Sequence, residues 1–376
     1  MKVLIAPDKF RGSLTAAEAA AAMAAGVARY NPDWTVQLLP VADGGEGTAE
    51  VLTAASGGSF IQARASDPLL RYVSCQYGIS ADGTTAFINL AEASGLQRLE
   101  PHEINAFRTS TIGTGQLIVH ALTRKCSRIV LGLGGSATID CGIGIAHALG
   151  IIFQDEFNGH LSPIGGNLPK IEFINARNRH AALGKTAFIV LHDVDNPLLG
   201  AEGAAMFAAQ KGISSEQLPL LETNLNHFAN LVEAQYAVVA KTPGMGAAGG
   251  AAMACMAFLG AKLARGSDFV LDALKIPEAI ATADLVITGE GHLDEQSLQG
   301  KAAIAVARQA QHQNKPVLAV CGRISLRPDL QIKEGITLSG ALMGREEAGL
   351  PVDSAKELAL RTEELLRELA PRLSEK

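Results

Sequence analysis

The sequence has little charge and no cluster of basic residues. Of its 376 residues, 19% are charged and 48% are hydrophobic, against a usual charged fraction of about 25%. The formal net charge is −6, and no run of lysine and arginine could follow a phosphate backbone, so we expect no nucleic-acid binding. A chain of this length with so few charges can bury a large core, and two cores more easily than one.

Paired cysteines and familiar catalytic patterns are also missing. Five cysteines are scattered along the chain without a C-x-x-C pair, which fits a reducing compartment and no disulfide framework. The charges at Asp8 and Lys9 leave too short an apolar segment for a signal peptide. The uncharged residues 242–261 are mostly Gly, Ala and Met, too weakly apolar to favour a membrane span. We therefore expect a cytoplasmic protein.

The common catalytic motifs G-x-x-x-x-G-K-[ST], H-E-x-x-H and G-x-S-x-G are absent from the sequence.

Both ends of the chain alternate between expected strands and helices. Thr15 and Glu18 have the spacing of a capping box before an alanine-rich helix. The expected strands are 2–6, 36–41, 284–288 and 316–320, and the expected helices are 15–29, 48–55 and 301–313. This alternation is typical of a parallel sheet covered by helices. Residues 354–373 form an amphipathic pattern that predicts a covering helix.

The middle of the chain has a different pattern. Residues 60–120 contain short alternating segments separated by Gly and Asp turns, which is typical of a mixed sheet. We therefore predict an α/β protein of two domains. A Rossmann-like, parallel-sheet domain would be built from residues 1–64 and 285–376. An inserted α/β domain with a mixed sheet would span residues 65–284, and the active site would lie in the cleft between the two.

Acidic and glycine residues follow several of the expected strands. The three segments are Asp43-Gly-Gly-Glu46-Gly47, His192-Asp193-Val194-Asp195 and Gly289-Glu290-Gly291-His292-Leu293-Asp294. In parallel sheets, ligands lie beyond the carboxyl ends of the strands. Acids at that place hold Mg²⁺ or deprotonate a hydroxyl group. Any single acid could instead cap a helix or form a turn, but three such loops favour a functional site.

Two glycine-rich turns could bind phosphate. They contain Gly134, Gly135 and Ser136 in one case, and Gly246, Gly249 and Gly250 in the other. Glycine lets backbone N–H groups approach a phosphate, and a helix N-terminus favours its negative charge. Close packing of a helix on a strand is the alternative for each turn. Both turns also match a dinucleotide-binding pattern, which keeps an NAD(P)-dependent oxidoreductase as an alternative function.

Seven short sequence motifs, taken together, resemble those of the bacterial type I glycerate kinases. They are PDKFRGSL (7–14), PVADGGEGT (40–48), GLGGSATID (132–140), DVDNPLLG (193–200), AAQKG (208–212), PGMGAAGG (243–250) and TGEGHLDEQSLQGK (288–301). The resemblance extends in order to about residue 325. It implies phosphorylation of D-glycerate to 2-phosphoglycerate, with ATP and Mg²⁺ as cofactors. Alternatives are a glycerate 3-kinase, a kinase of a related small hydroxy acid, and a non-catalytic sugar-acid-binding protein.

The resemblance also suggests roles for individual residues. Asp193 would accept or orient the proton of the substrate hydroxyl, and Arg11 and Lys211 would neutralise the substrate carboxylate or the transferred phosphoryl group. The Mg²⁺ ligands would be Asp43, Glu46 and Asp294, and the two glycine turns would bind phosphate.

The sequence departs from the family pattern at three places. Lys9-Phe10-Arg11 replaces the usual Ser-Phe/Tyr-Lys, and Ile139 and Cys141 replace an Asn and a Gly. His292 replaces the arginine of the family's G-E-G-R loop, so a fixed charge becomes a titratable one. It would bind a cofactor phosphate, or alternatively only hold the 290–294 turn by hydrogen bonds. The expected partners are the small molecules ATP and glycerate, with neither nucleic acid nor a membrane. The oligomeric state is left open, with a homodimer as one option.

Overall fold

The computed structural model describes residues 1–342 and 354–373, and its chain divides into two units. Unit 1 comprises Met1–Asp43 and Ser267–Lys376, and unit 2 comprises Gly44–Gly266. The units therefore divide earlier in the chain than the expected boundaries at 64 and 284. The helix α2 (Thr48–Ala55) contacts strands of the unit 2 sheet, which explains why these residues belong to the inserted unit.

Unit 1 is a parallel sheet of five strands. The strand order is β15-β13-β11-β1-β2, and every pairing in this sheet is parallel. The strands are β1 (Lys2–Ile5), β2 (Thr35–Leu38), β11 (Leu285–Thr288), β13 (Val317–Cys321) and β15 (Leu338–Ala341). The helices of this unit are α1 (Ala16–Tyr30), α9 (Ile276–Thr282), α10 (Ala302–His312), α11 (Pro328–Lys333) and α12 (Ser354–Leu373). The helix α8 (Gly266–Ala273) begins at the boundary, and β12 (His292–Leu293) pairs with β14 (Arg323–Ile324).

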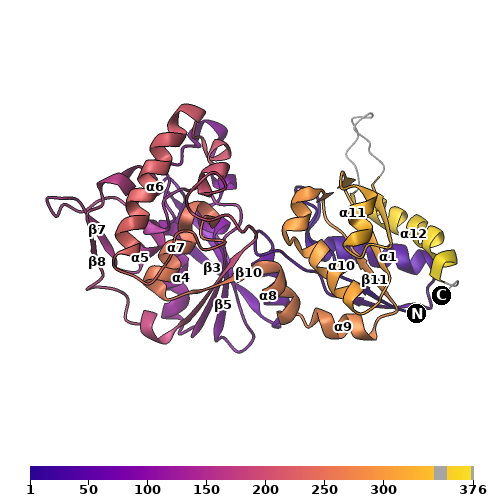
Figure 1. The fold of residues 1–376 in the computed structure, drawn as a ribbon. Helices are drawn as coiled ribbons and strands as arrows, with labels where there is room; N and C mark the ends of the chain where they lie inside the picture. Colours follow the sequence, from indigo (N-terminus) through magenta and orange to yellow (C-terminus); the bar gives the residue numbers. More distant parts are fainter. Residues whose placement is uncertain (343–353, 374–376) are drawn as a thin grey trace. The chain divides into compact units, whose positions relative to one another are not determined.

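The helices at the two ends of the chain pack against each other. The capping box begins α1 as the sequence predicts: the Glu18 backbone N–H donates to the Thr15 hydroxyl, and Glu18 accepts from the Thr15 backbone N–H. Along α1, Ala19, Met23 and Val27 recur at the spacing that puts them on one face, and all three are buried. Leucines of α12 join the same core. Figure 1 shows α12, in yellow, beside α1, in indigo.

Unit 2 has a mixed sheet of six strands. The order is β10-β9-β6-β5-β4-β3; the pairings from β10 to β5 are parallel, and the other two are antiparallel. The strands are β3 (Ser59–Ser66), β4 (Tyr72–Ile79), β5 (Thr85–Asn89), β6 (Arg128–Gly132), β9 (Ala187–His192) and β10 (Lys262–Arg265). The main helices are α2, α4 (Ile112–Thr123), α5 (Ile143–Ala148), α6 (Leu218–Glu233) and α7 (Ala247–Leu259), and a separate pair is β7 (Ile152–Gln154) with β8 (Phe173–Asn175). The predicted combination of a parallel and a mixed sheet is confirmed.

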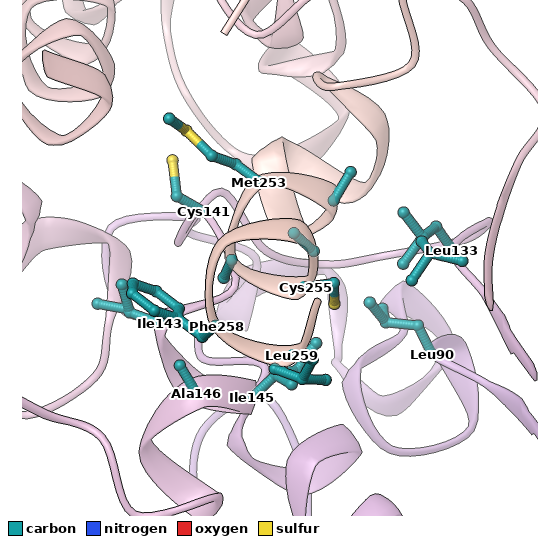
Figure 2. Packing of buried hydrophobic residues seen from close by; sticks show 14 of the residues in the cluster. Leu90, Leu133, Cys141, Ile143, Ile145, Ala146, Met253, Cys255, Phe258 and Leu259 are labelled. Atoms are coloured by element: carbon teal, nitrogen blue, oxygen red, sulfur yellow. The ribbon is translucent and has the colours of Figure 1, made fainter. Parts of the chain in front are cut away.

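The helix α7 lies in the core of unit 2. Figure 2 shows apolar side chains of other segments, among them Leu90, Leu133 and Ile143, arranged around this helix. The small Ala and Gly residues of α7 let neighbouring segments approach it closely. Most of the uncharged residues 242–261 are therefore buried in the core of unit 2. Within residues 1–342 and 354–373, no helix is long and apolar enough to cross a membrane.

The contact between α1 and α12 leads to a prediction about stability. A Cβ atom added at Gly26 would lie 2.4 Å from the Ala359 carbonyl oxygen and 2.7 Å from the Thr362 Cβ. Gly26→Ala gains about 1 kcal/mol of helix propensity, but we expect a net loss of about 1–3 kcal/mol because α12 must move away. Urea denaturation measures this loss. Ala25→Gly, at an exposed position of the same helix, gives the propensity term alone; a Gly26→Ala variant as stable as the wild type would contradict the expected clash.

Candidate active site

Three acidic side chains gather beyond the carboxyl ends of the unit 1 strands. Asp8 follows β1, Asp43 follows β2 and Glu290 follows β11, and these three strands are neighbours in the parallel sheet. The backbone continues to pair past the strand ends: the Asp8 N–H donates to the Gly289 carbonyl at 2.9 Å, and the Val41 N–H donates to the Pro7 carbonyl at 2.9 Å. All three acids are buried. The parallel sheet thus brings three carboxyl groups to one edge.

Burial and the charges of neighbouring acids make the carboxyl groups of Asp8 and Glu290 hard to ionise. Burial raises the pKa of Asp8 to about 8, with a further increase from the charge of Asp43 and a smaller one from Glu290. Burial likewise raises the pKa of Glu290 to about 7, against the lowering effect of the Lys301 ammonium 3.7 Å away. The Glu290 Oε1 atom is buried and has no hydrogen-bond partner among the described residues. A cation ligand at this edge would relieve both the repulsion and the unsatisfied oxygen.

The loop after β11 is held by its own side chains. Asp294 caps the short helix Glu295–Gln299, with its Oδ1 accepting from the Ser297 N–H at 3.1 Å. His292 is exposed, and its Nε2 lies 2.9 Å from the Ser325 hydroxyl while its Nδ1 lies 3.4 Å from the Asp294 Oδ2. These contacts support the alternative that a loop acid acts as a helix cap. They also account for His292 as a residue that fixes the turn.

Arg11 lies in a turn of unit 1 beside the same loop. The Phe10 N–H donates to the Leu14 carbonyl at 2.8 Å, which closes the turn and leaves Arg11 exposed. A Cβ atom on Gly291 would lie 3.1 Å from the Arg11 backbone nitrogen. The turn therefore packs on the loop that carries Glu290.

Unit 2 contains a buried lysine at its own strand ends. Lys211 is 4% exposed, and its Nζ donates to the Ser136 hydroxyl at 2.6 Å and to the Thr138 carbonyl at 2.9 Å. Burial lowers the pKa of Lys211 to about 7, and the charges of Asp140 and then Asp193 oppose that effect. Because Ser136 and Thr138 follow β6 and Asp193 follows the neighbouring β9, this group sits where ligands of parallel sheets bind.

The segment after β9 is fixed by its backbone and by His192. The His192 Nδ1 lies 2.9 Å from the Val194 carbonyl, and a Cβ atom on Gly244 would come within 2.9 Å of the His192 ring. Asp193 is half-buried, whereas Asp195 is exposed and forms an ion pair with Arg265. The segment thus places two acids two residues apart in different surroundings.

The two glycine turns differ in their surroundings. At the first, a Cβ atom on Gly134 would lie 2.5 Å from the Gly45 Cα, and Gly135 is exposed with φ of +78°, so the turn lies against the 43–47 loop and reaches the surface. At the second, Gly246, Gly249 and Gly250 are buried. A Cβ atom at Gly246 would lie 2.3 Å from the Pro197 carbonyl oxygen, and one at Gly249 would lie 2.1 Å from the Thr138 carbonyl oxygen. At Gly250 it would lie 2.6 Å from a Leu198 methyl group. Close packing therefore explains why glycine is required at these three positions.

Comparison with known proteins assigns the chain to a family. The model of the Glycerate kinase family matches residues 3–373. The chain belongs to the glycerate kinase family. It is 40% identical to "Glycerate kinase" of Bacillus subtilis over 361 residues, 96% of this chain and 94% of the relative. It is 41% identical to "Glycerate 2-kinase" of Escherichia coli K12 over 327 residues, 86% of each chain.

A solved structure agrees with the family assignment. The crystal structure of a protein assigned as glycerate kinase 2 from Salmonella typhimurium LT2 superposes with a TM-score of 0.87 at 36% identity, covering 100% of this chain and 99% of that chain. The resemblance drawn from seven sequence phrases is thereby confirmed, as is the fold class.

The expected metal ligands are divided between the two units. Asp43 and Asp294 lie in unit 1, whereas Glu46 lies in unit 2 and is exposed. No group of three or more His, Cys, Asp and Glu side chains in the described parts of the chain is placed to hold a metal ion by itself. Mg²⁺ in nucleotide sites takes one or two carboxylates and completes its shell with phosphate oxygens and water, so the acids around Asp43 still fit it.

Each unit's group of side chains includes acids to which the sequence analysis gave no role. Asp8 and Glu290 join Asp43, and Asp140 lies near Lys211. Asp8 and Glu290 follow expected strands, so their position in the sequence could have identified them as site residues. Asp140 follows a glycine turn in the middle of a run of small residues, and only the three-dimensional contacts reveal its surroundings.

The raised pKa values predict how stability depends on pH. The folded protein keeps a proton on Asp8 up to about pH 8 and on Glu290 up to about pH 7, whereas the unfolded chain releases both at lower pH. The free energy of unfolding should therefore fall as pH rises from about 4 to 8. In metal-free buffer, we expect Asp8→Asn to reduce this slope. Urea denaturation at pH 5 to 8.5 measures it. Asp33→Asn, an exposed aspartate of the same unit, is the control; equal slopes in all three proteins would rule out the buried acids as the cause.

Proposed function

We propose that the protein transfers the γ-phosphoryl group of ATP to D-glycerate and forms 2-phosphoglycerate. The observation that carries this proposal is the buried Lys211 with Asp193 near it at the carboxyl ends of neighbouring strands, in a chain of the glycerate kinase family. A cation and a carboxylate are the two groups that phosphoryl transfer to a hydroxyl needs from the protein.

Asp193 acts on the acceptor hydroxyl. The hydroxyl oxygen forms a bond to the γ-phosphorus, the bond from that phosphorus to the bridging oxygen of ADP breaks, and the hydroxyl proton passes to the Asp193 carboxylate. Asp193 suits this role because it is half-buried and lies on a segment fixed by His192. Such a positioned base contributes about 10²–10⁴-fold to the rate.

Lys211 and Arg11 supply positive charge in two different ways. Lys211 is held by Ser136 and Thr138, which use two of its three N–H donors. Its position is therefore fixed before the substrate binds, which suits the stabilisation of developing charge. Arg11 is exposed on its turn and suits the recognition of the substrate carboxylate or a phosphate by a planar guanidinium group.

The nucleotide phosphates would approach the first glycine turn. Gly134, Gly135 and Ser136 follow β6, and Gly135 is exposed, so backbone N–H groups there can face a ligand. His292 belongs to the loop that carries Glu290, and it would contact phosphate from the place where Ser325 and Asp294 hold it.

Mg²⁺ fits the acids at the unit 1 edge. The buried, unsatisfied Oε1 of Glu290 and the neighbouring carboxyl groups of Asp8 and Asp43 are hard oxygen donors, which Mg²⁺ prefers. We propose Asp43 and Glu290 as its ligands, with Asp8 beside them. Glu46 and Asp294 are weaker candidates, because the first is exposed and the second caps a helix. When bound, the metal neutralises phosphate charge.

A direct assay tests the proposed reaction. Purified protein with ATP, Mg²⁺ and D-glycerate should produce ADP and 2-phosphoglycerate, identified by ³¹P and ¹³C NMR, and EDTA should abolish the reaction until Mg²⁺ or Mn²⁺ is added in excess. L-glycerate and four-carbon hydroxy acids test the acceptor. Phosphorylation at the 3-hydroxyl would replace the proposal with a glycerate 3-kinase, and no turnover of any hydroxy acid would overturn it.

The role of Asp193 leads to a mutational prediction. Asp193→Asn keeps the shape of the side chain and removes its charge and basicity, so kcat should fall by about 10²–10⁴-fold. Steady-state kinetics and thermal unfolding give the effects on rate and folding. Asp195→Asn makes the same chemical change two residues away at an exposed position, and should change kcat less than tenfold. An Asp193→Asn variant within threefold of the wild type would remove Asp193 from the mechanism.

A further inference from the structure

Asp140 is a buried carboxylate that accepts four hydrogen bonds. The residue is 0% exposed. Its Oδ2 accepts from the backbone N–H and the hydroxyl of Thr111, both at 2.8 Å, and from the Gly144 N–H at 3.3 Å. Its Oδ1 accepts from the Gly142 N–H at 3.0 Å. Both oxygens therefore act as acceptors, which an asparagine could not reproduce because its NH₂ group would face a donor.

These hydrogen bonds tie the Ser136–Asp140 segment to the starts of two helices. Thr111 is the N-terminal cap residue of α4 and Gly142 that of α5. The Thr111 hydroxyl also accepts from the Ile145 N–H at 3.1 Å. The four hydrogen bonds to the Asp140 carboxylate restrict the conformation of this segment. The segment carries Ser136 and Thr138, the two residues that bind the Lys211 ammonium.

Asp140 and Asp193 are the charged groups that act on Lys211. Asp140 has the larger effect of the two. Burial raises the pKa of Asp140, whereas the hydrogen bonds from Thr111, Gly142 and Gly144 favour its charged form. Asp193, in the proposed reaction, takes up a proton, so its charge changes during turnover. Asp140 takes no part in that proton transfer.

We propose that Asp140 is a positioning residue, which keeps Lys211 charged and in place at Ser136 without touching the substrate. Its effect on the rate rests on the proposed role of Lys211 in the reaction, but its effect on the lysine does not. Two contributions are combined in one residue: the four hydrogen bonds fix the segment that binds the ammonium, and the negative charge compensates for its removal from water.

The titration of Lys211 in the free protein tests the electrostatic part. With ¹³C-labelled lysine, and with the signal assigned by its loss in Lys211→Arg, the midpoint should lie near pH 7 in the wild type. In Asp140→Asn it should fall by about one pH unit or more, a tenfold change in the proton affinity of the amine. Asp195→Asn makes the same change of charge at an exposed position and should leave the midpoint unchanged. An equal midpoint in Asp140→Asn and wild type would overturn the proposal.

A structural control separates the charge from the hydrogen bonds. Thr111→Val removes the hydroxyl donor to Asp140 and keeps its charge. We expect this variant to be less stable in urea but to retain the Lys211 titration midpoint.

A double variant covers the case in which Asp140→Asn does not fold. Asp140→Asn combined with Lys211→Met should recover folding, because it removes the uncompensated cation. Failure of the double variant to fold would show that Asp140 serves only the network, and would overturn the proposal.

The pH profile of kcat/KM connects the titration to the reaction. The alkaline limb should move to lower pH in Asp140→Asn, and the double variant with Lys211→Arg should have no such limb, because arginine stays charged. Suppose the Lys211 titration midpoint moves in the free protein but the alkaline limb of kcat/KM does not. That result would contradict the proposed role of Lys211 in the reaction, whereas the effect of Asp140 on the pKa of Lys211 would stand.

Discussion

A lysine ammonium that leaves water must receive hydrogen-bond acceptors and negative charge, and much of unit 2 serves this requirement at Lys211. The acceptors come from Ser136 and Thr138, in the segment that follows β6. The charge comes from Asp140 and Asp193. The glycines of the second turn let α7 approach the same segment closely, because any Cβ atom at Gly249 would collide with the Thr138 carbonyl. The tight packing of small residues around the segment is therefore part of how the cation is held.

Unit 1 meets the opposite requirement at its sheet edge. Three neighbouring parallel strands deliver Asp8, Asp43 and Glu290 to one place, where their charges repel one another. The charge of Lys301 lowers the pKa of Glu290, and that of Lys9 lowers the pKa of Asp8. A cation bound at this edge would favour the ionised form of these carboxyl groups, whereas unit 2 holds the Lys211 amine at Ser136 and Thr138.

The sequence predicts local structure well where a signal lies within a few residues. The capping box at Thr15 and Glu18 marks the start of α1, and the amphipathic spacing of residues 354–373 matches α12. The seven family phrases identify the family because each combines several residues in fixed order. Positions that depend on distant contacts are harder to predict. Gly246, Gly249 and Gly250 look like a phosphate-binding turn in the sequence, yet their neighbours are the backbone near Pro197 and Thr138.

The interleaving of the two chain ends in unit 1 has a consequence for synthesis on the ribosome. The strand β1 pairs with β11, the central strand of the sheet, and the Thr288 hydroxyl donates to the Ala6 carbonyl 282 residues away in the sequence. At about 5–20 residues per second, the N-terminal segment waits on the order of tens of seconds for its partners. The contiguous residues 44–266 of unit 2 emerge earlier and can fold first. The apolar β1 and α1 thus spend that interval without the strands and helix that later cover them, as a substrate for chaperones.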